Sequence, residues 1–333
     1  MPFDHTVLVV DDDPQTLASL REALAPHYHL AYGVSGEQAL EAAQRLHPSL
    51  ILLDINLPDM TGIEVCKKLK ALPDLQQTPV IFVSSNSEDA FGVDGFTSGG
   101  VDYITKPINP ELVVARVRTH ISLVQAERLE QAYNDAISML AVAGEYNDSD
   151  TGVHIRRMAA ISSVVARAAG WSRARVSLIE LAAQMHDIGK LGIPASILKK
   201  PGPLDTDEWA IMRKHPEIGH QILSVSEAPV FQLAAEIALA HHERWDGTGY
   251  PYGLAAEAIP ESAHIVAIAD VFDALTSVRP YKKAWSVGET MAHIRESAGS
   301  HFNPALVELF EANLAEVVET KAKFDQLAKV SLG

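Results

Sequence analysis

The sequence is poor in cysteine, in long apolar runs and in basic residues. Cys66 is the only cysteine among 333 residues, so the chain cannot form an internal disulfide, which fits a reducing compartment. No apolar stretch approaches the roughly 20 residues that cross a bilayer, and no basic segment followed by an apolar run opens the chain. These features predict a cytoplasmic protein without membrane insertion.

The balance of charge excludes a further class of partner. Lysine and arginine number 27 against 43 aspartate and glutamate residues, for a formal net charge of −16. A DNA-binding surface needs a basic face, so we expect no DNA partner. Hydrophobic residues make up 47% of the chain and charged residues 21%, which is typical of globular protein, and the length suffices for two domains.

Residues 1–120 alternate short apolar runs with amphipathic stretches such as PQTLASLREAL. The runs are VLVV (7–10), LILL (50–53), VIFV (80–83) and VDYI (101–104). Short runs rich in β-branched residues are typical of strands that are buried on both faces of a parallel sheet. We therefore predict an α/β doubly wound domain with a parallel five-stranded sheet.

Residues 111–143 form one long helical pattern without glycine or proline. Its apolar residues recur at spacings of three to five, which is close to a coiled-coil seam. They are Val117, Ile121, Val124, Leu129, Tyr133, Ile137 and Leu140. We interpret the segment as a connecting helix that also pairs two subunits in a homodimer; the alternative is a helix that packs only on its own domain. Residues 144–333 are helical throughout, with loops rich in glycine and proline, and predict an all-α domain.

Acidic residues cluster at the predicted strand ends of the first domain. Asp11 and Asp12 follow the first strand, and Asp54 ends the third. Carboxyl ends of parallel strands line one crevice, where three carboxylates suit a Mg²⁺ ion. Ser84 ends the fourth strand and Lys106 the fifth, which adds a hydroxyl and an ammonium group. This combination is what phosphoryl transfer to a carboxylate requires.

The segments VLVVDDDP, LILLDINLPDMTG, PVIFVSS and GGVDYITKP resemble, in order, the receiver domain of response regulators. The resemblance implies that Asp54 accepts a phosphoryl group from a cognate histidine kinase. It also implies a Mg²⁺ site held by Asp12, Asp54, the Asn56 carbonyl and, through water, Asp11. Ser84, Tyr103 and Lys106 match the switch hydroxyl, the rotating aromatic residue and the phosphate-binding lysine of that family.

The second domain carries a set of histidine and aspartate residues. The set comprises His154, His186, Asp187, His215, His241, His242 and Asp270. Imidazole and carboxylate ligands without thiols suit iron, manganese, zinc or nickel rather than calcium. Asp187 and Asp270 lie in apolar helical stretches, where an unpaired charge is costly unless a cation compensates it. Any one of these histidines could be an ordinary core or surface residue, but the whole set predicts a metal site.

HDIGK together with HHERWDGTGYP resembles the double signature of HD-GYP domains, which act on cyclic di-GMP. ADVFDALTSVRPYK and HFNPALVELF also match, so the resemblance covers roughly residues 140–325. It implies two divalent metals, iron or manganese foremost and nickel or zinc as alternatives. The first would be held by His154, His186, Asp187 and Asp270; the second by His215, His241 and His242, with Asp187 bridging the two.

The same resemblance implies roles around the substrate. Lys190 would lie near the scissile phosphate, Arg279 and Lys282 would contact substrate phosphates, and Tyr250 belongs to the substrate-binding GYP loop. Asp150 stands where the family usually has a glutamate, which helps to hold a third metal in some members. Because aspartate is one methylene shorter, we expect two catalytic metals rather than three.

We therefore predict a response regulator that hydrolyses cyclic di-GMP to the linear dinucleotide, to GMP or to both. Two alternatives remain open at this point. One is a phosphohydrolase of the wider HD superfamily that acts on another cyclic dinucleotide or nucleotide, which a panel of substrates would reveal. The other is a module that binds a nucleotide or a partner without turnover; the presence of all seven core ligands and Lys190 disfavours it.

Overall fold

The computed structural model describes residues 5–85, 97–144, 152–277 and 283–330. The chain divides into two compact units, Met1–Gln131 and Ala132–Gly333. Among the residues described, no helix combines the length and the apolar character needed to span a membrane.

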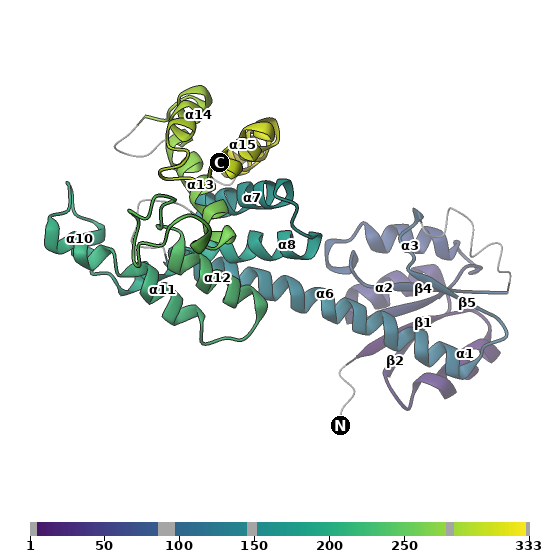
Figure 1. The fold of residues 1–333 in the computed structure, drawn as a ribbon. Helices are drawn as coiled ribbons and strands as arrows, with labels where there is room; N and C mark the ends of the chain where they lie inside the picture. The colour runs from purple at the N-terminus through teal and green to yellow at the C-terminus, as the bar shows by residue number, and fades with distance from the viewer. Residues whose placement is uncertain (1–4, 86–96, 145–151, 278–282, 331–333) are drawn as a thin grey trace. The chain divides into compact units, whose positions relative to one another are not determined.

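The first unit contains a parallel sheet of five strands in the order β2-β1-β3-β4-β5 (Figure 1). The strands are β1 (Thr6–Val10), β2 (His29–Gly33), β3 (Leu50–Asp54), β4 (Val80–Ser84) and β5 (Asp102–Thr105). β3 and β4 are buried at every position, as their apolar runs predict. The sheet confirms the predicted doubly wound class.

One strand had no apolar run in the sequence. β2, with the sequence HLAYG, lies at the edge of the sheet and is only partly buried. Because one side of an edge strand faces solvent, a continuous run of β-branched residues is not required there. The fifth strand also begins one residue later than its run suggests.

Helices cover both faces of this sheet. They are α1 (Pro14–Leu24), α2 (Gly36–Leu46), α3 (Gly62–Lys70) and the start of α6 (Pro110–Gly144), with a 3-10 turn, η1 (Pro73–Leu75). α2 and α3 pack on the face that carries Leu8, Ile51 and Phe82. α1 and α6 pack on the opposite face. Because successive side chains of each strand point to opposite faces, the sheet has one hydrophobic core on each face.

α6 runs continuously from the first unit into the second. Val117 and Ile121 are buried in the core of the first unit, and Ile137 in that of the second. Leu129 and Leu140, by contrast, are 72% and 49% exposed. The apolar residues of this helix thus have different environments: some pack in the core of one unit or the other, and others are exposed. They do not form one continuous seam for helix pairing.

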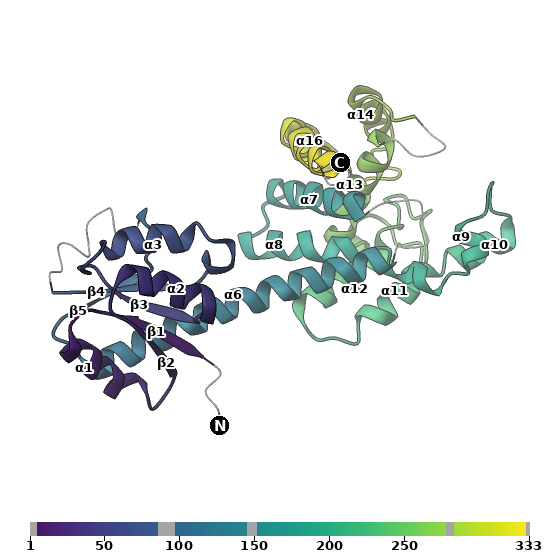
Figure 2. The same cartoon turned by 180° about the vertical axis from the view of Figure 1, so that it is seen from behind.

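The second unit consists of helices and loops (Figure 2). The α-helices after α6 are α7 (Gly152–Ala168), α8 (Arg173–Ala182), α9 (Ala195–Leu198), α10 (Thr206–Met212), α11 (His215–Leu223), α12 (Pro229–Ala240), α13 (Glu261–Thr276), α14 (Val287–Glu296), α15 (Pro304–Ala312) and α16 (Leu314–Val330). Short 3-10 segments are η2 (Ala183–Met185), η3 (Ile188–Gly192) and η4 (Ala256–Ala258). This architecture confirms the predicted all-α domain.

α7 lies at the centre of the second unit and packs against α8, α13 and α16. Nearly every residue from His154 to Ala166 is buried, including three polar or charged side chains besides His154. The core is completed from α13 and α15 by Phe272 and Phe310, whose ring centroids are 5.1 Å apart. A helix that is apolar on most sides is expected in such a central position.

Candidate functional site: a phosphoacceptor pocket and a metal centre

The predicted phosphoacceptor pocket forms at the carboxyl ends of β1 and β3. Asp11, Asp12 and Asp54 each offer an oxygen atom, and these atoms lie within 4.8 Å of one another. Asp11 and Asp54 are buried and Asp12 is exposed. Three converging carboxylates are the donor set that a hard divalent cation prefers, so the pocket fits Mg²⁺.

Lys106 follows β5 and reaches into this pocket. Its Nζ lies 2.9 Å from Asp11 Oδ2 and also forms an ion pair with Asp54. Burial acts to lower the pKa of Lys106, but the Asp54 and Asp11 carboxylates raise it overall. Burial raises the pKa of Asp11. The lysine is thereby held as a cation at the point where a phosphoryl group on Asp54 would need one.

The other predicted receiver residues lie directly after β3 or on the strands β4 and β5. The Asn56 N–H donates a hydrogen bond to Asp54 Oδ1 at 2.9 Å. Ser84 is buried at the end of β4. Tyr103 is half-buried in β5, with the Arg116 guanidinium 5.6 Å from its ring centroid. Gly62 opens α3 so close to Asp54 that a Cβ atom there would lie 2.1 Å from the Asp54 carbonyl oxygen.

A second cluster lies inside the all-α unit. Ligand atoms of Asp187, His215, His241 and His242 lie within 4.8 Å of one another. Asp187 lies between η2 and η3, His215 begins α11, and the two adjacent histidines follow α12. α12 ends at Ala240, just before these two histidines, and their ring centroids are 4.0 Å apart.

Three of the imidazoles are fixed by main-chain carbonyl groups. His186 Nδ1 lies 3.0 Å from Ala183 O, His215 Nδ1 2.8 Å from Met212 O, and His241 Nδ1 3.0 Å from Ala238 O. A carbonyl can only accept a hydrogen bond, so each Nδ1 carries a proton and the neutral form of each ring presents the lone pair of Nε2. These Nε2 atoms face Asp187, at 3.2, 3.2 and 3.6 Å.

The donor set fits a divalent transition metal. Among the described residues, Asp187 Oδ1, His215 Nε2 and His241 Nε2 are buried and make no hydrogen bond. Buried polar atoms are normally paired, and a shared cation would satisfy all three at once. Neutral imidazoles and a carboxylate are ligands typical of iron, manganese, zinc or nickel.

The electrostatics of the cluster match this donor set. Burial lowers the pKa of His241, and it lowers the pKa of His242 well below its ordinary value with help from the neighbouring imidazoles. Burial acts to raise the pKa of Asp187, but Lys190 and His186 lower it well below its usual range. The neutral forms of His241 and His242 and the ionised form of Asp187 are thus favoured, and these are the forms that bind metals.

Lys190 and Tyr250 border the cluster. Lys190 Nζ lies 2.7 Å from Asp187 Oδ2. The Tyr250 ring stacks on His242 with centroids 4.7 Å apart, and the Arg213 guanidinium lies 5.3 Å from the Tyr250 centroid. Burial raises the pKa of Tyr250, so its hydroxyl stays protonated.

A buried glutamate that we did not predict as a site residue holds the GYP loop. Glu243 accepts hydrogen bonds from the N–H groups of Tyr252 at 2.8 Å and Leu254 at 3.0 Å. Gly249 approaches the backbone so closely that a Cβ atom would lie 2.4 Å from Arg244 N. Together they fix the turn that places Tyr250 on His242. The signal in the sequence was the acid that directly follows the two histidines.

The remaining predicted ligands form a separate pair. His154 Nε2, from α7, lies 3.6 Å from Asp270 Oδ1, from α13. The opposite nitrogen, Nδ1, lies 2.5 Å from Asp273 Oδ2. Arg157 forms a bidentate ion pair with the same carboxylate. Asp273 and Arg157 were not predicted from the sequence, although each lies three residues after a predicted ligand and therefore on the same helix face.

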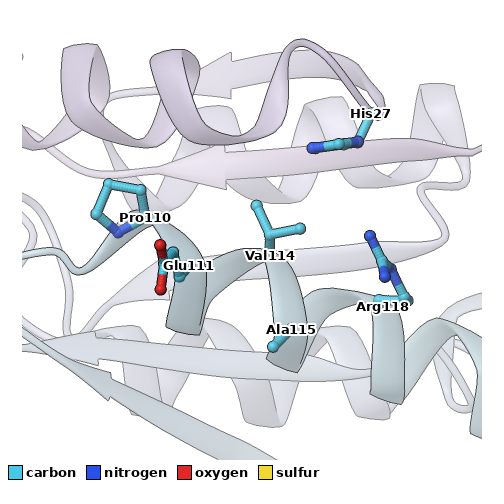
Figure 3. A pocket seen from close by; sticks show the side chains of 6 residues that line it. All are labelled: His27, Pro110, Glu111, Val114, Ala115 and Arg118. Carbon is cyan, nitrogen blue, oxygen red and sulfur yellow. The ribbon is translucent and has the colours of Figure 1, made fainter.

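Three predicted site residues, Asp150, Arg279 and Lys282, lie outside the described residues. The first unit also has a surface cavity of about 380 Å³. His27 and residues from the first turns of α6, among them Glu111, Val114 and Arg118, line it (Figure 3). None of the predicted site residues borders this cavity, so it is separate from both clusters.

Comparisons with known proteins agree with the division into a receiver domain and a helical second domain. A family model described as the response regulator receiver domain matches residues 7–118, and one described as the HD domain matches residues 136–306. The chain is 35% identical over 340 residues to "Cyclic di-GMP phosphodiesterase response regulator RpfG" of Xanthomonas campestris pv. campestris, covering 96% of this chain and 90% of that protein. It is 38% identical over 338 residues to a "Cyclic di-GMP phosphodiesterase" of Thermotoga maritima, covering 92% and 89%.

A shorter match reaches a protein with a different named substrate. The chain is 42% identical over 194 residues to "3'3'-cGAMP-specific phosphodiesterase 2" of Vibrio cholerae serotype O1. This match covers 58% of this chain and 37% of that protein.

The fold and the two clusters define a response regulator whose output domain is of the metal-binding HD type. The chain belongs to the HD-domain family, in the group of receiver-linked members that includes RpfG. The predicted family and fold class are thereby confirmed. The roles assigned to individual site residues stay predictions.

Proposed function

We propose that this protein is a metal-dependent phosphodiesterase that hydrolyses cyclic di-GMP under the control of its receiver domain. The cluster of Asp187, His215, His241 and His242 carries the proposal, because its ligand atoms converge and three of them lack any other partner. RpfG, which the chain matches over almost its whole length, bears the same activity in its name. We infer a two-metal centre with Asp187 as the bridge.

Bound divalent metals would supply a nucleophile near neutral pH by lowering the pKa of water, and would offset charge on the phosphate. The chain's own residues complete the site. The carbonyl-bound imidazoles are fixed in orientation, which keeps the donor set pre-organised. Lys190 is held as a cation beside Asp187, where it can bind a phosphoryl oxygen. Tyr250 offers a ring face at the edge of the cluster, and Arg279 and Lys282 would bind the substrate phosphates.

The metals are proposed to be iron or manganese, with nickel or zinc as alternatives, and two in number. Asp150 is the residue on which the number depends. If its carboxylate does not reach a third cation, Asp150→Glu raises the metal stoichiometry from two to three. A count of two in that variant would mean that another feature of the pocket excludes the third ion.

A second substrate is a specific alternative, because one relative is named as 3'3'-cGAMP-specific. Initial rates with cyclic di-GMP, 3'3'-cGAMP and a linear dinucleotide would decide between them. We expect the highest kcat/KM with cyclic di-GMP. A preference for 3'3'-cGAMP would overturn the substrate assignment but leave the metal centre intact. The product, linear dinucleotide or GMP, would follow from the same assay.

The receiver domain implies an upstream histidine kinase, and Asp54 is the proposed acceptor. Mg²⁺ would be held by Asp12, Asp54 and the Asn56 carbonyl, with Asp11 acting through water. Lys106 and Ser84 would bind the phosphoryl oxygens, and Tyr103 would turn inward. The lone thiol, Cys66, lies on α3 and is buried in the core of the first unit. We place these reactions in the cytoplasm, where histidine kinases act.

We also propose a homodimer through α6. One stripe of small and apolar residues along this helix is exposed and follows the alternating spacing of three and four that pairs helices. The stripe consists of Ala126, Leu129, Tyr133, Ala136, Leu140 and Ala143. Leu123 and Met139, 52% and 72% exposed, widen it. A second copy of the same helix offers a complementary surface.

The dimer is tested by the solution mass of the protein. Leu129 is the most exposed large residue of the stripe, so Leu129→Glu should convert the dimer into a monomer. Glu127→Gln, off the stripe on the same helix, is the matched control and should leave the dimer intact. A monomeric wild-type protein across the micromolar range would contradict the proposal.

A further inference from the structure

A buried network of charges lies behind one of the candidate metal ligands. Asp273 on α13 is completely buried, and both of its oxygens are engaged. Oδ2 contacts His154 Nδ1 at 2.5 Å and Arg157 at 2.7 Å, while Oδ1 accepts a further bond from Arg157 Nε. A buried carboxylate is tolerated only when it is paired and hydrogen-bonded, and this one is.

The network continues to the last helix of the chain. Arg157 donates to Asp325 Oδ1 on α16 at 2.8 Å and to Ser277 Oγ at 2.6 Å. Lys321, one turn before Asp325 on the same helix, donates to Asp325 Oδ2 at 2.8 Å. α16 and α7 lie side by side in this unit (Figure 2). A continuous chain of contacts thus joins α16 to His154.

His154 differs from the other candidate ligands in its partner. His186, His215 and His241 each place Nδ1 on a main-chain carbonyl oxygen of a nearby residue. His154 places Nδ1 on a carboxylate, which can only accept the proton, so Nε2 is presented towards Asp270. A carboxylate behind a ligating imidazole fixes its tautomer and orientation and makes it a stronger ligand.

We propose that Asp273 is a positioning residue for the His154 metal and that Arg157 and Asp325 hold it, so that α16 forms part of the metal centre. The inference rests on the proposed function, because it presumes that His154 ligates a metal. It makes the two metal positions unequal. The one that uses His154 depends on contacts among α7, α13 and α16, whereas the one that uses His215 and His241 depends on carbonyl groups close to each histidine.

The competing explanation is that the network only holds the three helices together. The two explanations predict different effects on metal affinity. A purely structural network, once weakened, would lower the stability of the metal-free protein without a preference for one metal. A positioning network lowers the affinity of one metal selectively.

The test is the metal content of the full-length protein after dialysis against a graded series of chelator concentrations. Wild type should retain two equivalents of manganese up to a given chelator concentration. Asp273→Asn keeps the side-chain shape but removes the charge, so one equivalent should be lost at a roughly 10- to 100-fold lower chelator strength. Asp325 contacts Arg157 and reaches Asp273 only through it. Asp325→Asn should therefore also lower the chelator concentration at which the same equivalent is lost, but by a smaller factor.

Two comparisons make the result specific. Glu311→Gln breaks an ion pair with Arg295 on the surface of the same unit and should retain both equivalents as wild type does. In a His154→Ala background, where the affected metal is already lost, adding Asp273→Asn should change nothing further. Unfolding of each metal-free variant in urea reports the structural contribution separately.

Wild-type retention of both equivalents by Asp273→Asn would overturn the proposal, and so would an equal weakening of both metals. If Asp273→Asn does not fold, Asp325→Asn decides: unchanged retention of both equivalents overturns the proposal. A wild-type protein that binds no metal would instead refute the proposed function.

Discussion

The protein itself favours the metal-binding protonation states of three candidate ligands, His241, His242 and Asp187. Burial depresses the pKa of His241 and His242, and Lys190 with His186 holds Asp187 ionised. The unfolded chain therefore binds more protons than the folded one between the depressed histidine pKa values and about 6.5. In the metal-free protein, the free energy of unfolding should fall as the pH drops below about 6.5.

Urea unfolding of chelator-treated protein between pH 5 and pH 8 measures this dependence. The contribution of Asp187 lies outside that window, because a depressed carboxyl pKa affects stability only near and below its ordinary value of about 3.8. His242→Gln removes one of the histidines whose pKa burial lowers and should flatten part of the profile. His241, His264 and His301, whose pKa burial also lowers, should retain the rest. Stability that rises on acidification would contradict the assignment of neutral imidazoles.

The types of the candidate metal ligands could be predicted from the sequence, but the groups that hydrogen-bond to these ligands and orient them could not. The set of histidines and aspartates was recognisable because thiol-free clusters of this kind have few other uses. The carbonyl partners of His186 and His215 could not be predicted, because main-chain acceptors leave no mark on residue identity. Asp273 and Arg157 could have been found from their spacing of three residues after Asp270 and His154.

Among the structural elements, the GYP loop depends on a single buried carboxylate. Glu243 accepts two main-chain hydrogen bonds, and a glutamine at this position could accept only one of them without rearrangement. Glu243→Gln should therefore lower the free energy of unfolding by about 1–3 kcal/mol. Because the loop also carries Tyr250, KM should rise more than kcat falls.

Steady-state kinetics and urea unfolding of the same preparations test this loop. Asp246→Asn is the matched control, since Asp246 lies in the same loop but is exposed and bonds to Thr248. A Glu243→Gln protein with wild-type KM and stability would show that the loop is held by other contacts.

Some of the strands and helices could be predicted from the pattern of apolar residues, and others could not. The buried strands β3 and β4 follow directly from their apolar runs, whereas the half-exposed edge strand β2 has no such run. The connecting helix matches its predicted bounds to within a residue. Its apolar residues could not be sorted by spacing alone, because Val117 and Ile137 face different cores while Leu129 faces solvent.

At the scale of the whole molecule, α6 is the covalent path between the phosphoacceptor pocket and the metal centre. Phosphorylation adds charge and acceptor oxygens at Asp54, which Lys106 and Ser84 can bind, and it shifts an equilibrium between conformations. We expect a small phosphodonor to change cyclic di-GMP turnover, and Asp54→Asn to abolish that change. Asp74→Asn, an exposed carboxylate of the same domain, should retain it.

Turnover and solution mass before and after confirmed phosphorylation provide the measurement. Equal turnover and equal mass in the two states would refute coupling through α6. The result is independent of the metal assignment, because both states are compared in the same metal-loaded preparation.

The most direct test of the account is the joint measurement of metal content and cyclic di-GMP turnover for anaerobically purified wild type and Asp187→Ala. The wild type should contain two divalent metals and hydrolyse the substrate. Because Asp187 would bridge both metals, Asp187→Ala should lose metal and turnover together while the first unit still binds Mg²⁺. An Asp187→Ala protein that keeps two metals and more than a few per cent of wild-type turnover would contradict the central claim.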